Sequence, residues 1–431
     1  MFNIIKQIYK ESGCAAMNEL GERIRKLRKD RGMTLMDVAG DQLSKGMLSL
    51  IENGRAKPSM ESLAFIAHQL GIDVHVLLEE RSSREIKEFL AQIEERMSEL
   101  DHIPYSETKK HMQATYSTLL PILQEKLPTT YEKGRLYEIG GRCLMNIGDE
   151  SEAKQLIETA VQIYESLSLY NQALKAKSRF VNKELAKGNY TAGLKLLHEL
   201  LEEHSEGPIV IDPVLQIELG YSEIVMLFGL GEYEEGKRGL ERLLHFSKQN
   251  KVFYRMDDIY RLAAFNALMH SDIEVFKLYL TKSRQFAQFT DNNETYALSL
   301  FIEAHYHNER TEDYDLALAL LEEACQLAKL EGEELGGYVY LEKGKAYWGK
   351  GMIDEAMDQF SLFHYPSDQN HPFDLAMLYT IDSYRALCLV EKGCFEEAMK
   401  HAEIAIQHAS ALPRTPYHDF IEETAERIKN Q

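Results

Sequence analysis

The sequence has few of the residues that mark special environments. Among its 431 residues are one tryptophan, ten prolines and five scattered cysteines, none of which has C-x-x-C spacing. An odd, widely spaced set of cysteines is typical of free thiols in a reducing cytosol and argues against a disulfide framework. Ten prolines are too few for a long disordered tail. A folded chain without disulfide bonds is therefore expected.

Long apolar runs are also missing. No uncharged apolar stretch approaches the roughly 18 residues that a membrane-spanning helix needs. Hydrophobic residues make up 44% and charged residues 27% of the chain, which is typical of a globular protein. Residues 1–16 begin with a short apolar stretch that charged residues interrupt, and they are expected to form a disordered extension. We expect a cytoplasmic protein with no membrane partner.

Positive charge is scarce except near the N-terminus. The formal net charge is −20, which argues against a protein that coats nucleic acid or anionic membrane without selectivity. Residues 18–58 are different, with nine Lys or Arg against six Asp or Glu. Any contact with DNA is therefore expected in this first part of the chain.

Residues 17–79 have the start and stop signals of five short helices. Gly32 ends the first helix, and Thr34 begins the second with Asp37 in the capping-box position. Ser44 is placed to cap a third helix that ends at Asn53-Gly54. Two short helices joined by a tight turn predict a helix-turn-helix DNA-binding domain.

The same segment resembles the Cro/phage-repressor (XRE) family in the runs Leu20-Gly21-x-Arg23-Ile24-Arg25, Leu43-Ser44-Lys45-Gly46-Met47-Leu48 and Pro58-Ser59. The resemblance implies a five-helix lambda-repressor-like domain whose third helix enters the major groove. It implies that bases are read by Lys45, Met47 and Ser49. It also implies that the DNA backbone is held by Ser44, Asn53, Arg55 and Lys57. The alternative for the basic residues of the first helix is a solvated helix face.

Two positions depart from the usual pattern of this family. Leu35 stands where the family often has a glutamine that contacts phosphate. The interval between Ala39 and Ser44 is one residue shorter than usual, a feature similar to the Rgg-like branch of peptide-responsive regulators. Gly46 is unusual inside a helix and could permit close approach to the DNA backbone.

The rest of the chain contains a repeat. Seven turn signatures recur along the chain, and the distances between their first residues are 40, 43, 40, 41, 39 and 42 positions. Small residues recur on both sides of most of these turns. The turns begin at Gly148, Gly188, Gly231, Ser271, Glu312, Gly351 and Gly393.

This pattern resembles tetratricopeptide repeats, which are pairs of antiparallel helices, although its period also suits HEAT repeats. The predicted fold is all-α, with the DNA-binding domain followed by a right-handed tetratricopeptide-like α-solenoid. A linker helix is expected over residues 80–102. The repeat domain is expected over 103–431, with seven or eight helix pairs, a degenerate pair near 105–127 and a C-terminal capping helix.

Such an array has a concave groove that suits a peptide. The register of the repeats predicts inward-facing side chains that combine basic, amide and aromatic groups. They are Arg142, Lys175, Asn182, Tyr221, Arg261, Phe265, Tyr306, Lys345 and Trp348.

The order and length of the two parts resemble the RRNPP regulators (Rgg, PlcR, NprR and Rap-like), which implies a homodimer that binds operator DNA and is switched by a short signalling peptide. The resemblance leaves two alternatives open. In one, the repeats bind a phosphorelay response regulator. In the other, they serve only to oligomerise a ligand-independent repressor.

Three apparent signals do not support an enzyme, a cofactor or a metal. Residues 231–237 imitate a phosphate-binding loop, but Arg238 replaces the Ser or Thr that binds magnesium, and three glutamates would repel phosphate. His305 and His307 diverge on a helix and are expected to be packing or surface residues. No arrangement of nucleophile, base and orienting group stands out. We expect a non-enzymatic protein without cofactor or metal.

Overall fold

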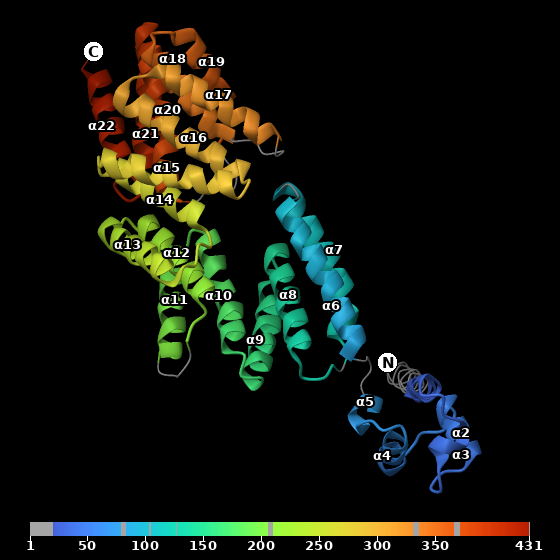
Figure 1. The fold of residues 1–431 in the computed structure, drawn as a ribbon. Helices are drawn as coiled ribbons and strands as arrows, with labels where there is room; N and C mark the ends of the chain where they lie inside the picture. The colour runs from blue at the N-terminus through green and yellow to red at the C-terminus, as the bar shows by residue number, and fades with distance from the viewer. Residues whose placement is uncertain are drawn as a thin grey trace. The chain divides into compact units, whose positions relative to one another are not determined.

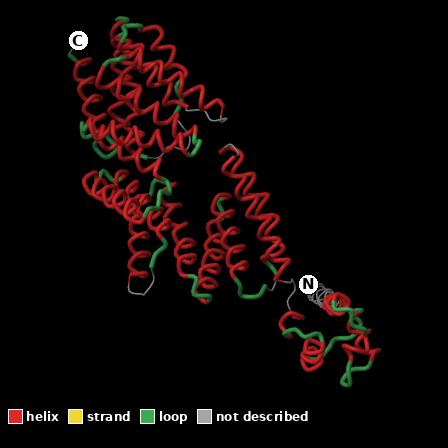
Figure 2. The backbone as a smooth tube through the Cα atoms, in the orientation of Figure 1, coloured by secondary structure: helices red, strands yellow, loops and turns green. Residues whose placement is uncertain are grey.

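The structure, a computed structural model, describes residues 20–78, 83–102, 105–125, 127–205, 210–330, 336–365 and 371–430. Throughout these ranges the chain consists of helices and loops, as Figure 2 shows, and the predicted all-α fold is confirmed. The chain divides into two compact units, one ending at Ala176 and one beginning at Lys177. The predicted extension, residues 1–16, lies outside the described residues.

The first unit begins with a small five-helix domain. Its core consists of residues that are fully buried, such as Ile24, Val38, Leu48 and Ile66. The helices are residues 20–30, α2 (Leu35–Ala39), α3 (Lys45–Glu52), α4 (Met60–Gln69) and α5 (Val74–Leu78).

The helix starts of this domain are capped as the sequence predicts. Thr34 and Asp37 form a reciprocal capping box at the start of α2, and the Ser44 hydroxyl accepts a hydrogen bond from the Met47 amide at 3.1 Å.

The remainder of the first unit is built from longer helices (Figure 1). One expectation is wrong here: residues 105–127 do not form a helix pair, because a single helix continues through Pro121. The helices are α6 (Ser83–Ser98), η1 (Glu99–His102), α7 (Tyr105–Leu123), α8 (Tyr131–Ile147), α9 (Glu150–Ser166) and α10 (Tyr170–Ala186), within which the two units divide.

The second unit continues the array of antiparallel helices. A short π-helical segment, η2, interrupts it, and the last described helix is α22. After α10 the helices are α11 (Tyr190–Ser205), α12 (Pro213–Gly229), α13 (Tyr233–Asn250), α14 (Met256–Met269), α15 (Ile273–Phe289), α16 (Asn293–Tyr306), η2 (His307–Thr311), α17 (Tyr314–Leu330), α18 (Gly336–Gly349), α19 (Ile353–Leu362), α20 (Pro372–Glu391), α21 (Phe395–Ala409) and α22 (Pro416–Lys429).

All seven predicted turns join two helices of a pair. At five of them a glycine has a positive φ, between 73° and 107°, which glycine adopts without strain. Ser271 and Glu312 adopt the same left-handed region at the other two turns, with φ of 59° and 55°. The turn geometry is therefore common to all seven pairs even where glycine is replaced.

The small residues beside the turns lie where two helices approach closely. A Cβ atom on Gly236 would overlap the Phe228 ring, and one on Gly344 would overlap the Phe360 ring. Phe360 is 1% exposed, so it has little room to move. This explains the recurrence of small side chains that the repeat pattern shows.

Within the second unit the array folds back on itself. The start of α20 lies against α12, where the His371 ring nitrogen Nε2 is 3.1 Å from the Val225 carbonyl oxygen. The start of α22 reaches α16, where the Tyr417 hydroxyl is 3.1 Å from His305 Nε2. Helices more than a hundred residues apart thus enclose a common interior.

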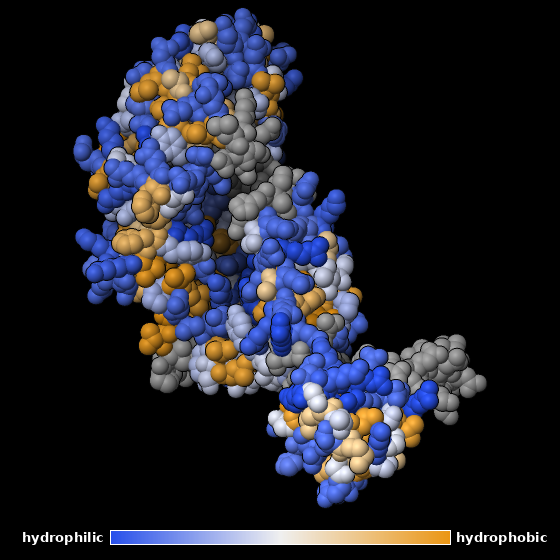
Figure 3. Space-filling view, turned by 45° about the vertical axis from the view of Figure 1, so that its right-hand side comes forward, coloured by the Kyte–Doolittle hydropathy of each residue, from blue (hydrophilic) through white to orange (hydrophobic). Residues whose placement is uncertain are grey.

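The surface visible in Figure 3 is mostly hydrophilic, with hydrophobic residues in small patches. Within the described ranges, no helix combines the length and apolarity needed to cross a membrane.

Candidate DNA-binding surface and ligand cavity

Helix α3 presents one exposed edge away from the core of its domain. Leu48 and Ile51 are buried, whereas Lys45 is exposed and Met47 is 44% exposed. Leu50, which the sequence analysis did not select, is 43% exposed on the same helix. A short helix with a positive charge and two apolar side chains on its free edge has the chemistry needed to contact base edges and thymine methyl groups.

Gly46 lies on this edge without a packing reason to be glycine. A Cβ atom at this position would come no closer than 3.8 Å to any neighbouring side chain, that of Ser44. Its φ is not in the left-handed region. The absence of a side chain therefore leaves open space outside α3, as close approach of a DNA backbone would require.

The end of α3 is held by hydrogen bonds within the domain. The Asn53 side-chain amide donates to the Ser49 carbonyl at 2.6 Å, and Arg25 donates to the Asn53 side-chain oxygen. Ser49 is half-buried. Arg55 and Lys57, in the loop after α3, are exposed. Of the residues expected to hold the DNA backbone, Arg55 and Lys57 are thus the freest to reach phosphate, while Asn53 is engaged internally.

Glu52 fixes α3 against the first helix. It is 2% exposed, and its two carboxylate oxygens accept from Arg28 Nε at 2.7 Å and Arg28 Nη2 at 2.9 Å. The hydrogen bond to Glu52 raises the pKa of Arg28 above its ordinary value. Arg28 also donates to the Met33 carbonyl at 3.0 Å. The alternative of a solvated helix face is therefore wrong for Arg28.

Replacing Glu52 by glutamine is expected to reduce the stability of residues 20–78 by about 2 kcal/mol, since hydrogen bonds to charged groups contribute on this scale. Hydrogen-exchange mass spectrometry on the full chain would measure the loss of amide protection in α3. Glu22→Gln, an exposed change on the first helix, is the control. Equal protection in the two variants would contradict the role given to Glu52.

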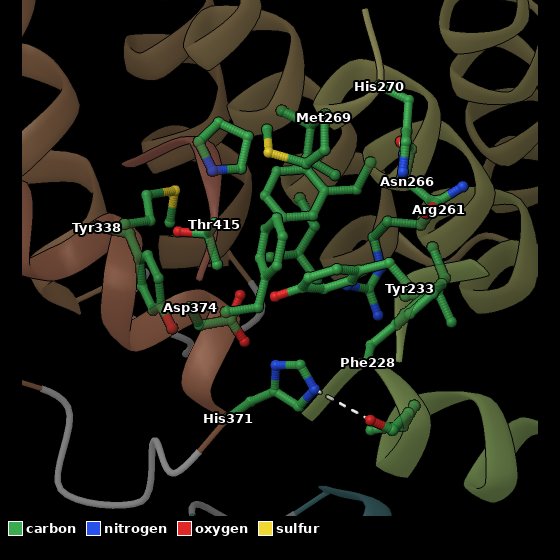
Figure 4. Close-up of a pocket in the computed structure, with 18 of the residues that line it drawn as sticks. Phe228, Tyr233, Arg261, Asn266, Met269, His270, Tyr338, His371, Asp374 and Thr415 are labelled. Atoms are coloured by element: carbon green, nitrogen blue, oxygen red, sulfur yellow. Dashed lines mark hydrogen bonds between the residues drawn. The ribbon is translucent and has the colours of Figure 1, made fainter. Parts of the chain in front are cut away.

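The second unit encloses a cavity of about 630 Å³. Figure 4 shows residues of its walls, which come from α12 to α14, from α16 and α18, and from the starts of α20 and α22 with the residues just before them. The volume lies within the range of roughly 300–1,000 Å³ that is usual for small-ligand sites. The cavity is therefore large enough for a small molecule or a few residues of a peptide.

Aromatic rings form a large part of the apolar wall. Phe265 and Phe373 meet edge to face with their centroids 5.1 Å apart, and Tyr233 meets Phe373 at 6.3 Å. The Phe373 ring also lies 5.9 Å from that of Tyr417. The first two contacts join α14 and α13 to α20, and the third joins α20 to α22, so these rings hold the walls of the cavity together.

A basic group on the α14 side shares one carboxylate with a second arginine. Arg261 Nη2 donates to Asp258 at 2.8 Å, and Asp258 also accepts from Arg255 at 3.0 Å. Arg255 lies over the Tyr221 ring, 4.2 Å from its centroid. Burial raises the pKa of Asp258, but the two arginines outweigh it and the pKa is lowered. The Arg261 Nε atom has no hydrogen-bond partner within the described part of the chain.

The structure brings three of the nine residues predicted to contact peptide into this cavity, namely Tyr221, Arg261 and Phe265. Arg142 and Lys175 belong to the first unit and are described separately from it. Asn182 is exposed and accepts a hydrogen bond from Ser222 at 3.3 Å, outside the cavity lining.

The other three predicted residues pack between helices. Tyr306 is 8% exposed and lies against the Phe276 ring at 5.0 Å. Trp348 meets Tyr384 edge to face at 5.4 Å. Lys345 is 2% exposed and pairs with Glu309 at 2.8 Å and with Glu342 at 2.9 Å. The Lys345 ammonium is thus held in a buried ion pair and is not part of the cavity lining.

Sequence reasoning missed the half of the cavity that comes from later repeats. His371, Phe373, Asp374 and Thr415 line it but precede or begin helices, outside the repeat positions that were used to select inward-facing residues. Pro372 at the first position of α20 marks a helix start, yet no local pattern indicates that this start lies against α12.

His305 is a packing histidine. It is 1% exposed, and its Nδ1 lies 2.9 Å from the Glu342 carboxylate. Among the residues that the structure describes, no group of three or more His, Cys, Asp or Glu is placed to hold a metal ion.

Residues 21–79 match the protein family described as "Helix-turn-helix domain". The predicted helix-turn-helix domain is therefore confirmed over residues 21–79, and the described residues after it form helical repeats.

The helix-turn-helix segment is similar to the HTH-type transcriptional regulator DdrOP3 of Deinococcus deserti, with 50% identity over 62 residues. That match covers 14% of this chain and 48% of the relative, so the chain spans about half the length of that protein.

Three solved structures are similar to larger parts of the chain. Bacillus thuringiensis PlcR in complex with the peptide PapR7 and DNA has 17% identity and a TM-score of 0.33, covering 64% of this chain and 96% of PlcR. The SHP pheromone receptor Rgg2 of Streptococcus dysgalactiae has 15% identity and a TM-score of 0.32, covering 67% and 99%. A tetratricopeptide repeat protein from Parabacteroides merdae has 13% identity and a TM-score of 0.44, covering 69% and 100%.

Proposed function

We propose that this protein is a transcriptional regulator that binds operator DNA through α3. The observation that carries the proposal is the exposed edge of α3 within a confirmed helix-turn-helix domain. The similarity of this segment to a protein named as a transcriptional regulator supports it. In this proposal Lys45, Met47 and Ser49 contact bases, with Leu50 added as an apolar contact.

The phosphates are held by Arg55 and Lys57, assisted by Ser44 and Asn53. Domains of this kind read two half-sites about one helical turn apart, so the proposal includes a homodimer. The rest of the chain is acidic and would repel the DNA phosphates, so other surfaces of the protein would not contribute to DNA binding. Specific binding then depends on the short α3 edge.

The second part of the proposal is that a short signalling peptide binds in the cavity of the second unit. Its volume of about 630 Å³ suits a few peptide residues and excludes a folded partner. Its aromatic wall and the neighbouring Arg261 and Asn266 suit apolar side chains and backbone amides. Since helices distant in sequence form the walls, a ligand between them would favour one curvature of the array over another.

Calorimetry of the full chain with short peptides encoded beside its gene tests whether a peptide binds. Fluorescence anisotropy with operator DNA tests whether the bound peptide changes DNA affinity. A peptide that binds the cavity should bind Phe265→Ala more weakly and should change the operator affinity of the wild type. By thermodynamic linkage, operator DNA must change peptide affinity by the same factor. If a peptide bound but left the operator affinity unchanged, the proposal that the peptide switches DNA binding would be refuted. If none of these peptides bound, the proposal that the cavity binds a signalling peptide would be refuted.

A further inference from the structure

The cavity lining contains charged side chains of both signs in an otherwise apolar wall. The basic ones are Arg261 and Arg414, and the acidic ones are Asp374 and Asp419. A charge that faces an apolar cavity is costly unless hydrogen bonds or a partner of opposite sign stabilise it. The pairing of these four groups therefore indicates which charge has no direct partner.

Three of these four groups, Arg261, Arg414 and Asp419, have a direct ion-pair partner. Arg261 is paired with Asp258 at 2.8 Å, and Asp258 is not part of the lining. Arg414 binds Asp419 and also Glu422, the latter at 2.9 Å. Arg414 and Asp419 are both well exposed at the rim, so water solvates them as well.

Asp374 is different. It is half-buried at the third position of α20, and within the described ranges its carboxylate takes part in no hydrogen bond and no ion pair. Figure 4 shows Asp374 among the residues that line the cavity, close to His371. Burial raises the pKa of Asp374, although the nearby His371 and Arg261 act in the opposite direction. Among the described residues, the charge of Asp374 is therefore offset without direct contact, by these two groups and by the positive N-terminal end of α20.

We propose that Asp374 binds a positively charged group, an ammonium or a guanidinium, on a ligand whose apolar body lies against the aromatic rings of the cavity. The inference rests on the proposed ligand site and adds its chemistry. A cation there completes a charge-assisted hydrogen bond in a place of low dielectric constant. The rings of Tyr233, Phe265 and Phe373 supply the apolar surface beside it.

A matched pair of fluorescent probes tests the charge preference directly. Dansylcadaverine carries a primary ammonium on an apolar naphthalene body, and its N-acetyl derivative has the same body without the charge. Binding of each to the full chain is measured by fluorescence titration. The wild type is expected to bind the charged probe about tenfold or more tightly than the neutral one, as a charge-assisted hydrogen bond contributes about 1.5–3 kcal/mol.

Variants assign this preference to one carboxylate. Asp374→Asn keeps the size of the side chain and should remove the preference. Asp419→Asn, a change in the other lining aspartate, should keep it because Arg414 already compensates Asp419. Phe265→Ala should weaken the binding of both probes, which would show that the probes bind in the cavity. Equal binding of the two probes to the wild type, an unchanged preference in Asp374→Asn, or no binding of either probe would each overturn the proposal.

A second experiment distinguishes the two possible sources of the cation in a peptide, the N-terminal ammonium and a Lys or Arg side chain. Peptides found in the calorimetry are compared with forms that are acetylated at the N-terminus or that have Lys and Arg replaced by Gln. A loss of affinity on acetylation assigns the cation to the N-terminus, and a loss on replacement assigns it to a side chain. Peptides that bind equally in every form would overturn the inference while leaving peptide binding intact. Probe preference without any peptide binding would instead refute the proposed peptide and retain the site.

Discussion

Replacing Glu342 by glutamine is expected to lower the free energy of unfolding of the second unit by about 3–5 kcal/mol at pH 7, as expected for breaking a buried ion pair. Glu342 is fully buried and accepts hydrogen bonds from His305 at 2.9 Å, Lys345 at 2.9 Å and Asn308 at 2.8 Å. Glutamine retains the volume but not the charge, so the buried Lys345 ammonium keeps only Glu309.

The loss should depend on pH. Burial by itself would raise the pKa of Glu342, but Lys345 and His305 outweigh it and hold the pKa well below its ordinary value. A carboxyl whose pKa is depressed by folding stabilises the protein above its unfolded pKa of about 4.3, and this contribution fades as the pH falls below that value. The difference between wild type and Glu342→Gln should therefore shrink below about pH 4.

Urea denaturation followed by tryptophan fluorescence measures both effects, because Trp348 is the one tryptophan of the sequence and lies in the second unit. Glu322→Gln is the matched control: Glu322 pairs with Lys343 but is 58% exposed, so its replacement should cost well under about 1 kcal/mol. If Glu342→Gln unfolded at the same urea concentration as this control, the buried network would not stabilise the unit.

Combining Lys45→Ala with Arg55→Ala is expected to reduce operator affinity by about 100-fold or more, since each such contact contributes about 1–3 kcal/mol. The two changes should act differently. Arg55→Ala removes a proposed phosphate contact, so it should weaken binding to all DNA sequences equally. It should also reduce the slope of log affinity against log salt concentration by about 1. Lys45→Ala removes a proposed base contact and should relax sequence preference at one position.

Fluorescence anisotropy with operator and scrambled DNA, over a range of salt concentrations, measures these effects. Lys29→Ala is a suitable control because Lys29 is an exposed lysine of the first helix, outside the proposed contacts. An equal loss of affinity in this control would mean that general positive charge, and not the α3 edge, accounts for binding.

The helix-turn-helix domain could be predicted because its signals are local. Thr34 and Asp37 satisfy each other's backbone amides across three residues, and Ser44 caps α3 across the same distance. The repeat turns were predictable for the same reason, since glycine marks the positive φ that each turn needs. Ser271 and Glu312 were recognised only by spacing, because their residue types do not favour that conformation.

The cavity could be predicted only in part. Tyr221, Arg261 and Phe265 follow from the repeat register: Tyr221 and Arg261 lie at corresponding places on α12 and α14, and Phe265 lies one turn after Arg261 on the same helix. Asp374 lies on α20, which reaches these helices through contacts such as that between Val225 and His371, 146 residues apart. No period of about 40 residues determines such a contact.

Lys345 shows that the repeat register can predict the direction of a side chain without predicting its surroundings. It has the inward position that the pattern predicts, yet it is buried by Glu309 and Glu342. A register gives the direction of a side chain relative to its helix. It does not give the neighbours that turn a free ammonium into a buried ion pair.

Dimethyl sulfate footprinting tests the central claim, that α3 lies in the major groove, most directly. The reagent methylates guanine N7, which is in the major groove, and adenine N3, which is in the minor groove. On genomic fragments selected by the wild-type protein, guanine N7 should be protected in two half-sites, and saturating Lys45→Ala protein should lose part of this protection. Protection confined to adenine N3, or an unchanged pattern with Lys45→Ala, would contradict the account.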